Sequence, residues 1–327
     1  MNKITFDSLE IEVTRRCNMR CPHCMKGEPQ DVDIKLEDID ALLDQIEMIG
    51  ILRVTGGEPT LNLDAVEYMA EAIIKRGIPV LQFQIITNGL IYEERLVAIA
   101  KRFRQIIDLS CQNCYPKSYN YVPISETCRV LIGVSLDRYH EQSNNALICA
   151  VKYMQALSGI ADIGIKRAGN APMASGRAKT LNDCYVTPYE KTLRYMREKQ
   201  IAVLSKDNKP GCIFHNNFNL CYPEQKLVCC SVSVNAYGYI VENLAMSYED
   251  NDQFPKVCHV TEDIWDSILR YNQNRLSCTV WNLGLLKYGE PLTEQEVHKT
   301  LFPPKDSEDY NLTQELVKAG MRLAEKL

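Results

Sequence analysis

Apolar and polar positions follow two alternating patterns over the first two thirds of the chain. Short apolar runs, typical of buried strands, are separated by longer segments whose apolar residues recur at helical spacing. The runs that predict strands are residues 9–13, 51–54, 80–86, 129–137, 161–167 and 201–205. The segments that predict helices are residues 35–49, 62–77, 92–103, 144–157 and 187–199. Strands and helices alternating at these lengths indicate βαβ units and a parallel sheet.

Six strands of this kind predict an α/β fold, as a partial or complete parallel barrel or an open doubly wound sheet. The pattern is interrupted by an insertion over residues 105–129. It changes again from about residue 207, where short strands around turns precede a helix over residues 262–275 and a polar tail with helical segments. We therefore expect an α/β domain over residues 1–206 and a small α+β module over residues 207–327.

Charge and hydropathy exclude several classes of protein. The chain has 327 residues and a formal net charge of −5, with no basic tail or stripe, so non-specific binding of nucleic acid is not expected. No apolar stretch approaches the length of a membrane span, and the N-terminus lacks the apolar core of a signal peptide. These features predict a cytoplasmic protein that does not enter a membrane.

Cysteine is unusually frequent for such a protein, with fourteen in the chain. Reducing conditions in the cytosol argue against a framework of disulfides, so metal binding or redox chemistry is the working explanation. Some of these cysteines should simply be core residues, because a free cysteine packs like a small hydrophobic side chain. Cys149, in an apolar run, is expected to be one of them.

Three cysteines, Cys17, Cys21 and Cys24, follow the first predicted strand with C-x3-C-x2-C spacing. Ligands of parallel α/β folds gather at the carboxyl ends of the strands, so this loop is well placed for a binding site. Three thiolates can hold three irons of a [4Fe–4S] cluster and leave the fourth iron open. A structural zinc ion is the alternative, but it would require a fourth ligand, and His23 within the loop is poorly placed to provide one.

Short polar motifs also end the next predicted strands. "TGGEP" at Thr55–Pro59 ends the second strand, "ITNG" at Ile86–Gly89 the third, and "SLD" at Ser135–Asp137 the fourth. The segment "KRAGNAPMASGRA" at Lys166–Ala178 follows the fifth. Glycine lets backbone atoms approach a ligand closely, and Glu58 provides a negative charge that suits an ammonium group. As ordinary turns these motifs would be unremarkable one by one, so it is their order that points to a shared site.

Taken together, these motifs resemble those of the radical S-adenosylmethionine (SAM) enzymes, over roughly the first 205 residues. The resemblance implies a (β/α)6 partial barrel in which Cys17, Cys21 and Cys24 hold a [4Fe–4S] cluster. It further implies that SAM binds the open iron and is cleaved reductively to methionine and a 5′-deoxyadenosyl radical, which abstracts a hydrogen atom from the substrate.

The same resemblance implies which residues contact SAM, with Arg167 and Arg177 as candidates to hold its carboxylate. The full set of expected contacts is His23, Thr55, Gly56, Gly57, Glu58, Pro59, Thr87, Asn88, Ser135, Asp137, Arg167 and Arg177.

The cysteines beyond residue 207 raise the question of a second cluster. The segment "FNLCYPEQKLVCC" resembles the first half of the auxiliary-cluster (SPASM or twitch) extension of peptide-modifying relatives, although Gln225 replaces the expected turn glycine and the dense cysteine block is missing. A shortened extension with a second iron–sulfur cluster would use Cys212, Cys230, Cys258 and Cys278. Without such a cluster, these residues are buried or reduced thiols, and one cluster per chain is expected.

The insertion has its own "CQNC" pair, Cys111 and Cys114, with Cys128 nearby. Such a pair is the usual half of a zinc or redox site, and Cys128 and His140 could supply further ligands. The alternative expectation is that these are thiols in a loop that faces the substrate.

The function expected from the resemblance is radical chemistry on a substrate covered by the C-terminal module. A ribosomal peptide is suggested by the C-terminal extension, whereas the first strand begins too near the N-terminus to leave room for a leader-binding domain. A small metabolite fits equally well. A reductant such as flavodoxin or ferredoxin is an implied partner. The competing class is a non-catalytic iron–sulfur or zinc protein, which would leave the strand-end motifs unexplained.

Overall fold

The structure is a computed structural model of the chain. It describes residues 3–114, 128–137, 139–140, 143–166, 175–181, 201–202, 228–241, 244–253, 256–268 and 286–287. The predicted helix over residues 187–199 lies outside the described residues, as does most of the chain beyond residue 268.

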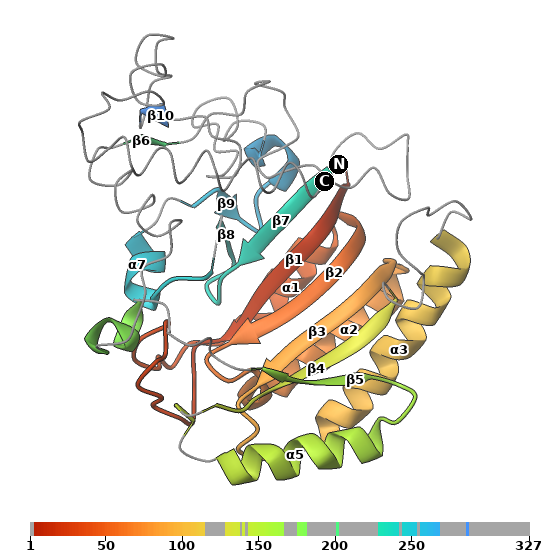
Figure 1. The fold of residues 1–327 in the computed structure, drawn as a ribbon. Helices are drawn as coiled ribbons and strands as arrows, with labels where there is room; N and C mark the ends of the chain where they lie inside the picture. The colour runs from red at the N-terminus through yellow and green to blue at the C-terminus, as the bar shows by residue number, and fades with distance from the viewer. Residues whose placement is uncertain are drawn as a thin grey trace, which may run out of the picture.

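A parallel sheet forms the centre of the fold (Figure 1). The order of its strands is β5-β4-β3-β2-β1-β7-β8-β9, and β1 to β5 are parallel throughout. These five strands span Ile4–Thr14, Ile46–Gly56, Val80–Thr87, Arg129–Ser135 and Asp162–Lys166. The mixed α/β fold with a parallel sheet, expected from the alternating pattern, is confirmed.

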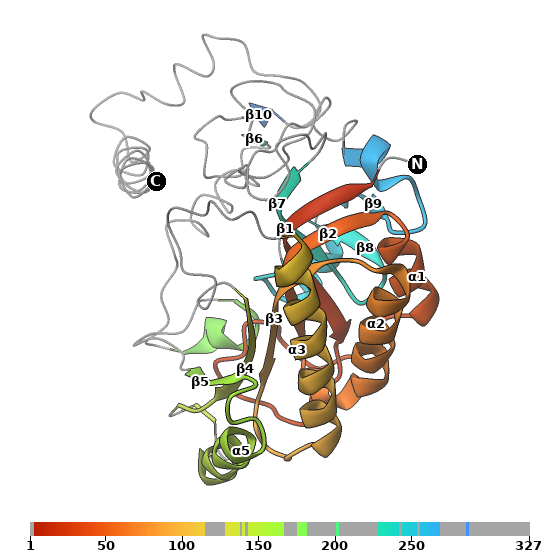
Figure 2. The same cartoon turned by 90° about the vertical axis from the view of Figure 1, so that its right-hand side faces the viewer.

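Helices cover one face of this sheet, and α1, α2 and α3 lie on the same side of it in both views (Figures 1 and 2). Their bounds are Leu36–Leu43, Leu63–Arg76 and Glu94–Cys114. The core is made of apolar side chains from the strands and the inner helix faces, among them Ile11, Leu52, Phe83 and Phe103, all fully buried. Helix α5, at Ser143–Ala156, contacts β4 and β5, and Cys149 on it is buried as expected.

The helix predicted over residues 35–49 was wrong in its second half. α1 ends at Leu43, and residues 46–49 already belong to β2. Ile46, Met48 and Ile49 are all buried, with Ile46 opposite Ile4 of β1. Apolar residues at this spacing satisfy either a helix or a strand that is buried on both faces, so periodicity alone could not separate the two.

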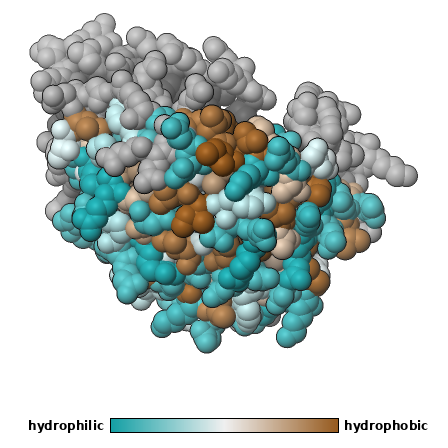
Figure 3. All heavy atoms as spheres, turned by 90° about the horizontal axis from the view of Figure 1, so that it is seen from below, coloured by the Kyte–Doolittle hydropathy of each residue, from teal (hydrophilic) through white to brown (hydrophobic). Residues whose placement is uncertain are grey.

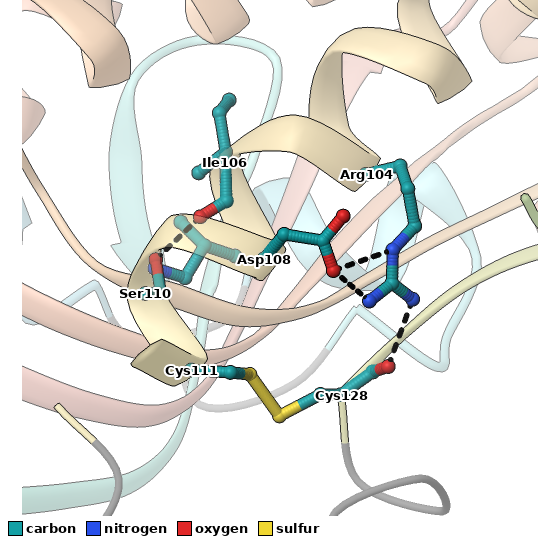
Figure 4. The surroundings of a disulfide bond; sticks show 7 residues. Arg104, Ile106, Asp108, Ser110, Cys111 and Cys128 are labelled. Carbon is teal, nitrogen blue, oxygen red and sulfur yellow. Dashed lines mark hydrogen bonds and ion pairs between the residues drawn. A yellow bond between two sulfur atoms is a disulfide. The ribbon is translucent and has the colours of Figure 1, made fainter. Parts of the chain in front are cut away.

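The insertion begins later than expected, because α3 continues to Cys114. At its end the structure forms a disulfide between Cys111 and Cys128, which joins α3 to the start of β4 (Figure 4). Arg104 donates a hydrogen bond from Nη1 to the Cys128 carbonyl oxygen (3.1 Å) and also pairs with Asp108. The expectations of a substrate-facing loop of thiols, and of a reduced Cys111 and Cys128, are therefore wrong for these two residues.

A metal site that combines Cys128 with His140 is also excluded. Cys128 precedes β4 and His140 follows it, and seven strand residues at ~3.3 Å each separate the two ends of that strand by about 20 Å. The side chain of Cys114 is not among those described.

Strands from beyond residue 207 extend the sheet on its other edge. β7 at Val228–Val234 pairs with β1 in parallel, and β8 at Tyr239–Val241 and β9 at Cys258–His259 follow antiparallel. Of the predicted sixth strand, the structure describes Ile201–Ala202, which form β6 and pair with β10 at Leu286–Lys287 in a separate sheet. Among the described residues β5 is therefore an edge strand. β7 instead covers the open edge of β1 with the fully buried Val232 and Val234.

Viewed from below, the surface mixes hydrophobic and hydrophilic residues (Figure 3). Its exposed apolar residues include a row on α5, formed by Leu147, Ile148, Val151 and Met154. None of the described helices is both long enough and apolar enough to cross a membrane.

Candidate functional site

The carboxyl ends of β1 to β5 meet at one edge of the sheet, because the five strands are parallel and in register. The pairs Thr14–Gly56, Thr87–Val134 and Ser135–Lys166 mark this edge. The cysteine loop and the motifs after β2, β3 and β4 therefore lie at one common end of the sheet, as expected from the parallel order.

The cysteine loop is closed at its base by backbone hydrogen bonds. Arg15 N donates to Val32 O (2.8 Å), and Gln30 N donates to Arg15 O (3.1 Å). Ile34 N donates to Val13 O one step further back (3.0 Å). These bonds hold the two ends of residues 16–29 together beside the sheet. The loop that carries the three cysteines therefore has a fixed base.

Cys17, Cys21 and Cys24 are free and half-buried. Burial raises the pKa of the Cys21 thiol to about 11, and the negative charges of Cys24 and Cys17 add to this shift. Burial likewise raises the pKa of Cys17, with smaller contributions from Glu58 and Cys24. A cation bound by these thiols would favour their deprotonated form.

Gly56 and Gly57 pack against the backbone that leads into the cysteine loop. Gly57 N donates to Thr14 O (2.9 Å), and Glu58 N donates to Arg16 O (2.8 Å). A Cβ atom on Gly57 would lie 2.4 Å from Arg16 O, and one on Gly56 would lie 2.5 Å from Thr14 O. These glycines are therefore required by close packing of two backbones, a reason that the sequence did not reveal.

Glu58 joins the end of β2 to the end of β3. Its carboxylate is 1% exposed and accepts hydrogen bonds from Thr60 Oγ1 (2.6 Å) and from Asn88 N (2.7 Å). Burial raises the pKa of this carboxyl, while the bonds from Thr60, Asn88 and Thr87 oppose the shift. The expectation that Glu58 meets an ammonium group stays a prediction.

Asn88 links β3 directly to the cysteine loop, since its Nδ2 donates to Asn18 Oδ1 (2.8 Å). Thr87 beside it is buried, and its Oγ1 accepts from Gly89 N (3.1 Å). Thr55 is half-buried in β2, and Pro59 is buried directly after Glu58.

His23 lies against the segment that follows β4. Its ring stacks on Tyr139, with centroids 4.8 Å apart, and meets His140 edge-on at the same distance. Asp137 Oδ1 lies 2.8 Å from His140 Nδ1, and Ser135 ends the strand before it. His23 Nδ1 is buried with no partner among the described residues.

Ligand atoms of His23, Asp137 and His140 all lie within 4.8 Å of one another. Two imidazoles and a carboxylate could hold a divalent ion. They could equally line a polar organic ligand beside the cysteine loop, which is the role predicted from the sequence for His23 and Asp137. Their part in binding SAM stays a prediction.

Arg177 reaches the cysteine loop from beyond β5. It donates from its backbone N to Cys24 O (2.9 Å), from Nε to Cys21 O (3.0 Å) and from Nη1 to Gly27 O (2.7 Å). Gly176 has φ of +52°, and a Cβ there would lie 2.4 Å from Met25 O. The guanidinium thus holds the loop carbonyls, whereas contact of Arg177 with a SAM carboxylate stays a prediction.

A second group of contacts on this loop was missed by the sequence analysis. Arg15 is fully buried and donates to Glu12 (3.0 Å) and to Asn251 (3.2 Å), and it pairs with Asp252 (2.8 Å). Lys26 in the loop donates to Glu12 and to Leu244 O (2.7 Å).

These contacts bring residues 244–252 against the cysteine loop. The only signal in the sequence was a pair of arginines beside the first cysteine, and nothing in the spacing indicated their distant partners.

Several predicted residues lie outside the described part of the chain. They are Arg167, Cys212, Cys221 and Cys278. Cys229 and Cys230 lie on β7, but their side chains are not described, and Cys258 is buried on β9.

A family model matches part of the chain. Residues 11–138 match the family model described as "Radical SAM superfamily". This match runs from β1 through the cysteine loop to Arg138, and so includes the motifs at the ends of the first four strands.

Curated relatives each match a part of the chain. A GTP 3′,8-cyclase of Limosilactobacillus fermentum is 29% identical over 123 residues, which are 36% of this chain and 36% of the relative. One from Geobacter sulfurreducens is 30% identical over 135 residues, 39% of this chain and 41% of the relative. Molybdenum cofactor biosynthesis protein 1 of Drosophila melanogaster is 36% identical over 101 residues, 28% of this chain and 17% of the relative. The matched part therefore spans less than half of each relative.

Among solved structures, anSMEcpe with bound AdoMet and a Cp18Cys peptide aligns with a TM-score of 0.45 and 11% identity, over 99% of this chain and 100% of the other. Streptococcus suis SuiB bound to precursor peptide SuiA aligns with a TM-score of 0.41 and 14% identity, over 80% of this chain and 64% of the other.

The family match covers the segment in which the three cysteines, the paired glycines after β2 and the polar end of β4 meet. Over residues 11–138 the chain is therefore similar to the radical SAM superfamily, a family whose members bind a [4Fe–4S] cluster and SAM.

Proposed function

We propose that the protein is a radical SAM enzyme that cleaves SAM reductively and abstracts a hydrogen atom from an organic substrate. The observation that carries this proposal is the set of three free, half-buried cysteines on a loop held in place from three sides. When bound, the cluster and SAM would supply the electron and the 5′-deoxyadenosyl radical.

The residues present fit an iron–sulfur cluster. Cys17, Cys21 and Cys24 would hold it, since none of them is in a disulfide and their charges act on one another. The described residues bring no fourth cysteine to this loop, which suits three thiolate ligands and one open iron. Arg177 and the paired glycines fix the loop backbone, so that the thiols are positioned before the cluster binds.

SAM would bind between the cysteine loop and the ends of β2, β3 and β4. Polar groups there that can bind it include His23, Asn88, Ser135 and Asp137. Thr55, Gly56, Gly57, Glu58, Pro59, Thr87, Arg167 and Arg177 complete the proposed set. For the paired glycines, Glu58 and Arg177, the hydrogen bonds and close packing described above support a positioning role, in which they hold the strand ends and the cysteine loop around the ligand.

The substrate is proposed to be a ribosomal peptide or a small metabolite. The GTP 3′,8-cyclases match this chain over less than half of their own length. Their nucleotide substrate is therefore not carried over to this protein. A reductant such as flavodoxin or ferredoxin would deliver the electron.

Residues 207–327 are proposed to form a module that covers the substrate. Part of this segment joins the central sheet, because β7 pairs with β1. We propose one cluster per chain. A second would draw on Cys258 together with Cys212, Cys230 and Cys278.

Anaerobic incubation of the reconstituted protein with SAM and dithionite tests the activity. The wild-type protein should release 5′-deoxyadenosine, and a variant with alanine at positions 17, 21 and 24 should release none. Equal release by the triple variant would show that the three cysteines are not the site of cleavage.

A further inference from the structure

Tyr248 has a buried hydroxyl that the proposed function does not yet use. The residue begins α7 (Tyr248–Gln253), far along the chain from the cysteines, and is 3% exposed. Its hydroxyl oxygen is buried with no hydrogen-bond partner in the part of the chain that the structure describes. A buried hydroxyl without a hydrogen-bond partner costs free energy, so a ligand that pairs with it there would relieve that cost.

The backbone places Tyr248 beside the cysteine loop. Tyr248 N donates to Lys26 O (2.9 Å), two residues beyond Cys24. The ring lies between two cations, 4.7 Å from the Arg15 guanidinium and 5.6 Å from the Lys26 ammonium. These contacts fix the ring plane, so the hydroxyl has little freedom to turn elsewhere.

Negative groups of β1 and of the cysteine loop act on the Tyr248 hydroxyl. Burial raises the pKa of Tyr248, and the negative charges of Glu12, Cys24 and Cys17 raise it further, against an opposing effect of Arg15. Glu12 already accepts from Arg15 Nε, Lys26 Nζ and Ala236 N. The loop that Tyr248 contacts through Lys26 carries the free thiols of Cys17 and Cys24, so a cluster held there would bring sulfur acceptors close to Tyr248.

We propose that the Tyr248 hydroxyl donates a hydrogen bond to a sulfur atom of the cluster held by Cys17, Cys21 and Cys24, and that it thereby raises the reduction potential of that cluster. Tyr248 is a positioning residue in this account, because it acts through the cluster. Hydrogen bonds to cluster sulfurs stabilise the reduced, more negative state. The proposal rests on the cluster of the proposed function.

The test compares Tyr248→Phe, which removes only the hydroxyl, with Tyr237→Phe. Tyr237 is a matched control, since its ring also lies 4.7 Å from the Arg15 guanidinium, whereas the residue is 44% exposed. Iron content and the midpoint potential of the cluster are measured on anaerobically reconstituted full-length protein. We expect a more negative potential in Tyr248→Phe at unchanged iron content, and a wild-type potential in Tyr237→Phe.

A wild-type potential in Tyr248→Phe, or an equal shift in both variants, would overturn the proposal. If Tyr248→Phe binds less iron than the wild-type protein, the thermal stability of the two cluster-free proteins is compared to separate an effect on the cluster from a structural effect. Unchanged stability of the cluster-free variant supports an action on the cluster, and a matching loss of stability shows a purely structural role. Failure of the proposed function is distinguishable, because the wild-type protein itself would then hold no cubane cluster.

Discussion

Glycine at position 57 illustrates how single residues shape the site. A Cβ there would lie 2.4 Å from Arg16 O and 2.9 Å from Arg15 O, both backbone atoms that cannot swing away. Gly57→Ala should therefore lower the free energy of unfolding by about 1–3 kcal/mol, as overpacking does, and displace the cysteine loop.

Thermal unfolding and the iron content after reconstitution measure both effects. Gly164→Ala on β5 is the control, because its Cβ would meet only Leu131 Cδ1, at an ordinary 3.6 Å. An iron content equal to that of the control would mean that this turn does not position the cysteines.

Arg177 is a second single residue that shapes the site, through the hydrogen bonds that its side chain donates to the cysteine loop. Arg177→Lys keeps the charge but loses the fork that reaches the carbonyls of Cys21 and Gly27, and about 1–3 kcal/mol of loop stability with it. Hydrogen exchange of residues 17–29 should become faster, and the cluster should be lost sooner to a chelator. Arg20→Ala is the matched control in the same loop, since Arg20 is 80% exposed. Exchange no faster than in Arg20→Ala would contradict the bracing role of Arg177.

At the scale of the elements, the disulfide between Cys111 and Cys128 fastens the end of α3 to the start of β4. It closes a segment with a sequence separation of 17, for which the loss of unfolded-state entropy corresponds to about 3 kcal/mol. Cys111→Ser should lower the unfolding free energy by about this amount, and a reductant should do the same to the wild-type protein.

Cys111→Ser is the control for the addition of reductant, because a reductant should not destabilise this variant further. Neither change should affect SAM cleavage, because the bond lies before β4 and the site after it. If the reductant left the unfolding free energy of the wild-type protein unchanged, that result would contradict a disulfide in solution.

The elements show how far the sequence could be interpreted. The strands β1 to β5 and the site at their carboxyl ends follow from apolar runs and from motifs that end them. Residues 46–49 were misassigned because Ile46 and Ile49 fit both periods. The pairing of β7 with β1, and the contact of Tyr248 with the cysteine loop, depend on residues more than two hundred positions apart, which no local pattern encodes. The disulfide was not expected because the reducing conditions of the cytosol argued against disulfides.

At the scale of the whole molecule, a buried charge network joins the two ends of the described chain around the site. Arg15 and Glu12 are both fully buried, and their partners come from the cysteine loop on one side and from residues 235–252 on the other. Removing one member of such a network strands a buried charge, which typically costs about 3–5 kcal/mol. The cysteine loop and the described residues 235–241 and 244–252 are therefore held together, and the proposed cluster depends on this arrangement.

The central claim is that three cysteines hold one [4Fe–4S] cluster whose open iron takes SAM. Electron paramagnetic resonance of the reduced, anaerobically reconstituted protein, recorded with and without SAM, tests it most directly. We predict about four irons per chain, a cubane signal that changes when SAM is added, and no iron or signal after alanine replaces Cys17, Cys21 and Cys24. A cubane signal that persists in this triple variant, or a wild-type signal that is indifferent to SAM, would contradict the account.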